Sequence, residues 1–229
     1  SPGLVWFNGK ELCFRNIRRG HVADLVKIFS RFDHKDIHVG EIDDPFRELC
    51  IPFPKDNLNL YKDIEDYNTI LINLIKREGI TKVVIEDYSY ASVSSSFIQI
   101  IEYQVDLRMK LYRAGIEFHA VSPLSIKKFA TGDGISSKYD LLIKFLEEEK
   151  NNYQYENNFW NNINYYKDAI IIKKPGKDPG VLKPFDDLID AFYMFKYCVE
   201  TDFEKLKKQK KKEKELKAKN KKEKRLNFC

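Results

Sequence analysis

From residue 63 to residue 149, segments with the apolar spacing of helices alternate with short apolar runs, and this order constrains the fold more than any other feature. The predicted elements are a helix at 63–78, a strand at 82–86, a helix at 94–114, a strand at 116–121 and a helix at 137–149. Strands separated by helices pair in parallel, and their carboxyl ends meet at one edge of the sheet. The sequence therefore predicts an α/β fold with Glu86 at that edge.

The two later helices each carry apolar residues at the spacing of a buried face. On the helix at 94–114, the expected core residues are Ile98, Ile101, Val105, Met109 and Tyr112. On the helix at 137–149, which Ser137 caps, they are Leu141, Leu142, Phe145 and Leu146.

The first residues carry the signal of a β-hairpin. Two predicted strands, at 4–7 and 10–14, are separated by Asn8 and Gly9, which tolerate the positive φ that a type I′ turn needs at both positions. The third strand is not determined, because a helical pattern and two extended ones follow, at 21–32, 37–42 and 49–53.

The chain divides into a body at 1–200 and a Lys-rich tail at 201–229. Within the body, residues 150–183 are predicted to be an insertion rich in Asn, Tyr and turn formers, followed by a helix at 185–197. From Asp202 onward the tail holds 13 Lys or Arg and 5 Asp or Glu, although the whole chain has a net charge of only +5. The tail lacks an apolar stripe, so we expect it to be a solvated helix or disordered. Its function is either that of a non-specific solvated appendage or that of a tether that attracts nucleic acid by its positive charge.

The composition favours a cytoplasmic protein. No stretch reaches the roughly 20 apolar residues of a membrane span, and no leader with a cleavage site is evident. The four cysteines are far apart and only four histidines are present, which argues against zinc and for reduced thiols.

Three acidic residues, Glu86, Asp187 and Asp190, are candidate metal ligands. Asp187 and Asp190 share one helical face, where like charges are unfavourable without a cation between them. Oxygen ligands without nearby His or Cys favour Mg²⁺ or Mn²⁺, and two such ions can hydrolyse a phosphodiester. Two alternatives stay open: the acids after Pro184 only oppose the helix dipole, or Asp186 is the partner of Asp190.

A segment with lysines and glycines follows the strand at 116–121. Its glycines let the backbone approach a phosphate, and its lysines add positive charge. The candidate DNA-binding residues are Lys127, Lys128, Gly132, Gly134 and Lys138. The alternative is an ordinary surface loop with solvated lysines, because the spacing is not that of a Walker loop.

Three motifs occur in the order and approximate spacing of RuvC-like Holliday junction resolvases, particularly the diverged phage and viral versions. They are IEDYSY at 85–90, SPLSIKKFATGDGISSK at 122–138 and DDLIDAF at 186–192. The resemblance covers residues 64–149 and 184–198. It implies a ribonuclease H-like fold, with a mixed five-stranded sheet between helices on both faces, and two Mg²⁺ ions.

By this resemblance, Glu86, Asp187 and Asp190 are metal ligands. Lys127 and Lys138 match the active-site and DNA-contacting lysines of the family, and the aromatic near the scissile strand is Tyr88 or Tyr90. One departure concerns the first ligand, an Asp in the first strand just before a Ser/Pro/Gly-type turn, because this chain begins with Ser1, Pro2 and Gly3. We expect that acid upstream of Ser1, and we expect this 229-residue form to bind metal poorly.

Three functions are compatible with these patterns. The first is a Mg²⁺-dependent endonuclease that cuts four-way or other branched DNA as a homodimer, because a four-way junction presents two symmetric scissile phosphates. The second is a non-catalytic branched-DNA-binding protein on the same fold. The third is a ribonuclease H-like enzyme that acts on RNA–DNA hybrids.

Overall fold

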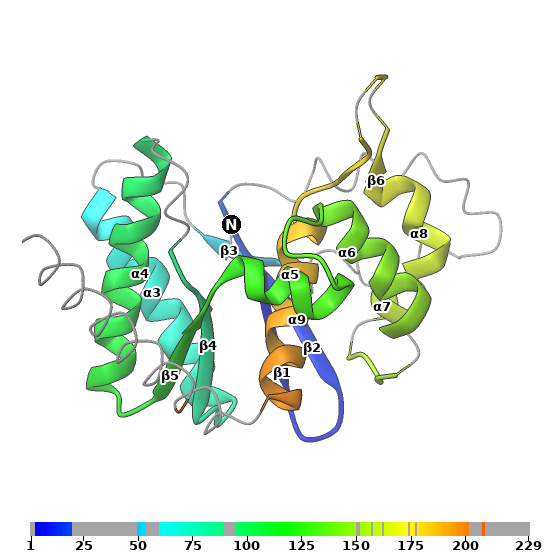
Figure 1. Cartoon of the computed structure of the whole chain (residues 1–229). Helices are drawn as coiled ribbons and strands as arrows, with labels where there is room; N and C mark the ends of the chain where they lie inside the picture. Colours follow the sequence, from blue (N-terminus) through cyan, green and yellow to red (C-terminus); the bar gives the residue numbers. More distant parts are fainter. Residues whose placement is uncertain are drawn as a thin grey trace, which may run out of the picture.

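The computed structural model describes residues 3–19, 50–53, 60–88, 95–149, 152–156, 158–161, 163–173, 175–176, 178–201 and 208. The patterns noted at 21–32 and 37–42, Tyr90 and nearly all of the tail lie outside these residues. In chain order (Figure 1) the elements are β1 (Gly3–Phe7), β2 (Leu12–Arg19), β3 (Cys50–Phe53), α3 (Leu60–Arg77), β4 (Lys82–Glu86), α4 (Ser95–Arg113), β5 (Glu117–Val121), α5 (Pro123–Thr131), α6 (Lys138–Lys144), the π-helix η1 (Phe145–Glu149), α7 (Asn158–Asn161), α8 (Ile163–Ile170), β6 (Ile171–Ile172), β7 (Gly180–Val181) and α9 (Phe185–Glu200).

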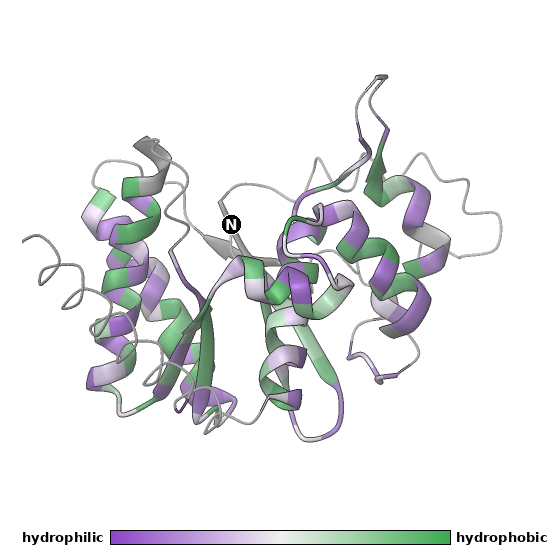
Figure 2. Ribbon diagram, viewed as in Figure 1, coloured by the Kyte–Doolittle hydropathy of each residue, from purple (hydrophilic) through white to green (hydrophobic). Residues whose placement is uncertain are grey.

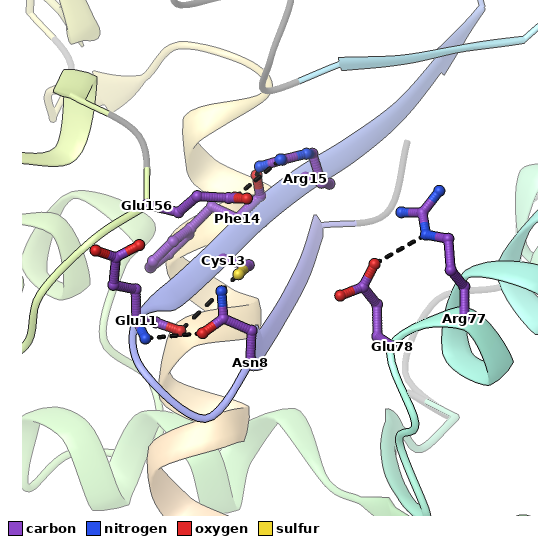
Figure 3. Close-up of polar contacts among 8 residues, drawn as sticks. All are labelled: Asn8, Glu11, Cys13, Phe14, Arg15, Arg77, Glu78 and Glu156. Carbon is purple, nitrogen blue, oxygen red and sulfur yellow. Dashed lines mark hydrogen bonds and ion pairs between the residues drawn. The ribbon is translucent and has the colours of Figure 1, made fainter.

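β1 and β2 form the predicted antiparallel hairpin, but its turn differs from the expected one. Residues 8–11 connect the strands, and of the two central residues predicted for the turn only Gly9 has a positive φ, of 96°. The side-chain oxygen of Asn8 instead accepts a hydrogen bond at 2.9 Å from the backbone N–H of Glu11 (Figure 3), and another at 2.9 Å from the backbone N–H of Lys10. The prediction of a type I′ turn was therefore wrong, because the asparagine side chain closes a longer loop.

β4 and β5 pair in parallel, as predicted, with Glu86 opposite Val121 at their carboxyl ends. The described strands do not form one five-stranded sheet. β1, β2 and β3 make one sheet, β4 and β5 a second, and β6 and β7 a third. The fold is thus mixed α/β, while the expected single ribonuclease H-like sheet is not formed by the described residues, in which β1 and β4 are not hydrogen-bonded neighbours.

Two helices, α3 and α9, lie on opposite faces of the two larger sheets. On β1, Leu4 packs in clusters with α3, whereas Val5 packs in the cluster that contains α9. On β4, Val83 packs in a cluster with α3, whereas Val84 packs against the cluster that contains α9. Since successive side chains of a strand point to opposite faces, each helix covers one face of both sheets.

α4 has nearly the predicted bounds but buries a different face. Leu107 and Leu111 pack against residues of α3. The expected core residues are exposed or half-buried instead: Ile98, Ile101, Val105, Met109 and Tyr112. That prediction was wrong because α4 is apolar on two sides, and only the position of α3 decides which side is covered.

The largest buried cluster lies among β2, α6, η1, α9 and the described part of residues 150–183. Its aromatic rings pack closely: the ring centroids of Phe14 and Trp160 are 4.3 Å apart, and those of Phe145 and Phe192 are 4.8 Å apart. Figure 2 shows hydrophobic residues on the facing sides of these elements. The four core residues predicted for 137–149 are all buried here: Leu141, Leu142, Phe145 and Leu146.

The expected insertion is joined to this core by polar contacts as well. Arg15 forms an ion pair with Glu156 at 2.8 Å (Figure 3). The backbone N–H of Leu12 donates to the carbonyl of Gln154, also at 2.8 Å. The described residues of 150–183 therefore complete the main core.

In the part of the chain that the structure describes, no helix is both long and apolar enough to cross a bilayer. Cys13 and Cys198 are buried free thiols, and burial is the main reason that the pKa of each is raised to about 12. Both are therefore protonated at neutral pH.

Candidate active site

Three acidic residues at the start of α9 surround one lysine ammonium. Nζ of Lys138 lies 2.9 Å from Oδ2 of Asp190, and 3.3 Å from both Oδ2 of Asp186 and Oδ1 of Asp187. Lys138 is the first residue of α6, which a capping box at Ser137 starts, as predicted for this cap. Asp186 and Asp187 were both compatible with the helical spacing as partners of Asp190, and in the structure both lie at the ammonium of Lys138.

In this cluster the negative charges of three carboxylates outnumber the single positive charge of Lys138. Burial opposes the charge of Lys138, but Asp190, Asp186 and Asp187 raise the pKa of the lysine above its ordinary value. Burial also raises the pKa of Asp190; Lys138 counteracts this effect, while Asp187 and Asp186 add to it. Three carboxylates thus share one ammonium, and a further positive charge would stabilise their ionised forms.

Glu86 lies in the electrostatic field of the same cluster. It ends β4 and is partly exposed, yet neighbouring protein removes enough water to raise the pKa of its carboxyl, and Asp190 and Asp187 raise it further. Lys138 and Lys127 have the opposite effect on this pKa. The fold thus brings together groups from β4, α5, α6 and α9.

The donor chemistry of this cluster fits a hard divalent cation, because it consists of carboxylate oxygens and a cationic group already lies among them. Within the described residues, no three His, Cys, Asp or Glu side chains are grouped tightly enough to hold a metal ion. The carboxylates of Asp187 and Asp190 are directed at the ammonium of Lys138 instead. A divalent ion at this position would therefore replace the ammonium.

The lysines and glycines of the second motif are placed differently from expectation. Lys127 and Lys128 lie on α5 rather than in a loop; Lys127 is half-buried and Lys128 is exposed. Gly132 ends α5 with a φ of 85° and donates its N–H to the carbonyl of Lys128. A Cβ on Gly134 would lie 3.2 Å from a backbone carbonyl of α5. Both glycines therefore have a conformational role inside the chain.

Arg108 of α4 contacts Asp87 and Tyr88, the two residues that follow Glu86. The guanidinium carbon of Arg108 lies 4.4 Å from the ring centroid of Tyr88. Its Nη2 donates to Oδ1 of Asp87 at 3.4 Å and to Oε1 of Gln104 at 3.1 Å. No local pattern pointed to Arg108, because Asp87 is 21 residues away and no local spacing links the two residues.

Tyr67 of α3 is a second residue whose place near the site was not foreseen. Burial raises the pKa of its hydroxyl most, and Tyr103 and then Asp187 add to this effect. Tyr67 therefore lies within electrostatic range of Asp187, and its ring is edge-on to that of Tyr103 at a centroid distance of 5.3 Å.

The fold and the site together define a mixed α/β protein with an acidic cluster that a lysine partly neutralises. No protein-family model matches the sequence, and neither does any curated protein. Among solved structures, the chain is similar to the RuvC structure of Thermus thermophilus, with 13% sequence identity and a TM-score of 0.34. The match covers 38% of this chain and 52% of that chain, so it spans about half of the RuvC protein. Function does not follow from a match at this level.

Proposed function

We propose that the protein is an endonuclease that hydrolyses phosphodiester bonds in branched DNA, with divalent ions held by Glu86, Asp187 and Asp190. The observation that carries the proposal is the shared environment of these acids. Asp190 and Asp187 both raise the pKa of Glu86, and both form ion pairs with the ammonium of Lys138. The three sequence motifs supply the expectation of DNA as the substrate.

Each residue of the site has a defined part in this proposal. A bound Mg²⁺ pair would supply an activated water and would stabilise the leaving oxygen. Lys127 contributes positive charge beside Glu86, where a scissile phosphate would lie. Lys138 neutralises the acids of α9 before an ion binds. Tyr88, fixed by Arg108, offers an aromatic ring to an unpaired base.

The test is Mg²⁺-dependent nicking of a synthetic four-way junction, with a linear duplex and an RNA–DNA hybrid as comparison substrates. The 229-residue chain and a form extended upstream of Ser1 are both assayed. Glu86→Gln and Asp190→Asn are expected to abolish nicking while junction binding is retained. Glu147→Gln, at an exposed position of η1, is the matched control and is expected to leave nicking unchanged.

The other functions give different results in the same assay. Binding of the junction by both forms without nicking would replace the nuclease by a non-catalytic DNA-binding protein. Faster cleavage of the hybrid than of the junction would favour the ribonuclease H-like alternative. Nicking that survives both Glu86→Gln and Asp190→Asn would remove the acidic cluster from the mechanism.

DNA binding is tested separately through its salt dependence. Lys128 is exposed, so Lys128→Gln is expected to weaken junction binding and to lower the salt slope by about 1, the effect of one lost phosphate contact. Deletion of the residues after Glu200 is expected to flatten the slope further, if the tail tethers DNA. An unchanged slope in both variants would place DNA binding elsewhere.

A further inference from the structure

Two exposed apolar side chains, which together form an apolar tip, lie close to each other beside the candidate active site. Ile135 is 83% exposed, the largest fraction among the large hydrophobic side chains in the described part of the chain, and Leu124 of α5 is 60% exposed. A Cβ on Gly134 would lie 3.8 Å from the Cβ of Leu124, so the backbone that leads to Ile135 lies against this leucine. Ile135 is three residues from Lys138, so their Cα atoms are at most about 11 Å apart.

The loop that carries Ile135, between α5 and α6 (Figure 1), is held by its own hydrogen bonds. The hydroxyl oxygens of Thr131 and Ser136 are 2.6 Å apart. The carbonyl of Asp133 accepts from the hydroxyl of Ser136 at 2.9 Å, and Oδ1 of Asp133 accepts from the N–H of Ile135 at 3.1 Å. Ile135 is therefore held in its exposed position by a loop of defined conformation.

The same hydrogen bonds use backbone amides that could otherwise bind a phosphate. The N–H groups that donate within the chain are those of Gly132, Asp133, Ile135, Ser136 and Ser137. A phosphate site of the kind that the glycines suggested needs backbone N–H groups directed at the ligand. What the loop presents to the surroundings is instead an aliphatic side chain.

Positive charge lies beside the apolar tip. Lys127 and Lys128 follow Leu124 by three and four residues on α5, so both lie on the same side of this helix as the leucine. Lys128 is exposed, and Lys127 is half-buried. The carboxylate of Asp133 has one oxygen directed at the backbone of Ile135. An apolar group next to cations complements DNA, which combines apolar base faces with anionic phosphates.

We propose that Ile135, supported by Leu124, is a wedge that enters an unstacked base step of branched DNA. Aliphatic side chains are inserted between bases by many proteins that kink DNA. Insertion into a continuous duplex costs the stacking of a paired step, and this cost is least where bases are already unpaired. Ile135 therefore selects a branch point over a linear duplex. The inference rests on the proposed function and names the residue that makes its substrate branched DNA.

The first experiment measures base unstacking with 2-aminopurine, a base whose fluorescence rises when it leaves the stack. A four-way junction that carries this base beside the branch point is saturated with protein in EDTA, so that no DNA is cut. The wild-type chain is expected to raise the fluorescence. Ile135→Ser is expected to remove most of this rise, whereas Ile135→Leu, which keeps an aliphatic side chain, is expected to retain it.

The second experiment compares the affinities for the junction and for a linear duplex of the same sequence. Ile135→Ser is expected to reduce the preference for the junction about 10-fold, the effect of one such side chain that is no longer buried. Its salt slope is expected to stay unchanged, in contrast to Lys128→Gln, because no charge is lost. Val199→Ser is the matched control, since Val199 is an exposed β-branched residue of α9, and it is expected to keep the preference.

Three results would overturn the inference. They are a fluorescence rise that Ile135→Ser leaves intact, an unchanged preference for the junction, and a change in molar mass by light scattering, which would make the apolar tip a contact between proteins. Nicking is judged separately. A chain that unstacks the branch point without nicking it keeps this inference and loses the proposed activity, and one that nicks without unstacking loses this inference alone. A chain that does not bind the junction loses both.

Discussion

Nζ of Lys138 lies 2.9 Å from Oδ2 of Asp190, and this ion pair joins the first turn of α6 to α9 across 52 positions of the sequence. It places a cation that belongs to the chain where the carboxylates of α9 converge. In the proposed function, a divalent ion held by these carboxylates would displace a tethered ammonium, so metal binding would be linked to the stability of the metal-free protein.

Lys138→Met removes the ammonium and is expected to destabilise the metal-free protein, because the carboxylates of α9 then repel one another without compensation. After allowance for partial exposure, we expect about 1 to 2 kcal/mol, or a melting temperature lowered by about 3 to 6 °C. Millimolar Mg²⁺ is expected to restore more stability in this variant than in the wild type. Lys144→Met, which removes a lysine of the same helix paired with Glu148, is the control. Equal effects of the two substitutions would contradict the cation role of Lys138.

Glu86→Gln is expected to stabilise the metal-free protein at neutral pH. Because the folded state raises the pKa of Glu86 above its ordinary value of 4.5, ionisation of this group opposes folding as the pH rises through the raised pKa. Because Glu86 is exposed and solvent screens its charge, the gain is only about 0.5 kcal/mol, or about 1 to 2 °C, and it is expected to vanish well below pH 4.5, where the glutamate is neutral in both states. Thermal melts of both proteins from neutral to acidic pH test this. A gain that is constant over that range would mean that the charge of Glu86 is not its cause.

Gly3→Ala is expected to lower stability by about 1 to 3 kcal/mol, the usual effect of overpacking. A Cβ at this position would overlap the carbonyl of Asp187 and lie 2.8 Å from the backbone nitrogen of Leu188. At Gly180 the nearest atom would be 3.9 Å away, in Ile172, so Gly180→Ala is the matched control. Urea unfolding curves compare the two variants. Equal stability of the two would show that β1 does not approach α9 this closely.

Trp160→Ala is expected to cost about 3 to 5 kcal/mol, because the indole is buried among Phe14, Phe145 and Phe185. The measurement is again the free energy of unfolding in urea, with Lys167→Ala, at an exposed position of α8, as the control. A loss below 1 kcal/mol would mean that residues 150–183 are a separable insertion rather than part of the core.

Local patterns were sufficient for the strands of the hairpin, for α3, β4, α4, β5, α6 and α9, and for the two carboxylates that α9 brings to the site, but not for β3, α5 or the elements within residues 150–183. The bounds of β4 agree with the prediction to the residue, and the cap at Ser137 is present. The spacing of Asp187 and Asp190 placed both carboxylates on one face of a helix. These features depend on backbone geometry that a few neighbouring residues determine.

What the sequence by itself determined about this protein is the order of β1, β2, α3, β4, α4, β5, α6 and α9, the apolar character of both sides of α4, and the acids available at the start of α9. Only the tertiary structure decided that α3 covers the Leu111 side of α4, that Trp160 joins the main core, and that the ammonium of Lys138 lies among the acids. The physical reason is that burial and ion pairing depend on which surfaces meet in space. Residues far apart in the sequence make those contacts, and no local period records them.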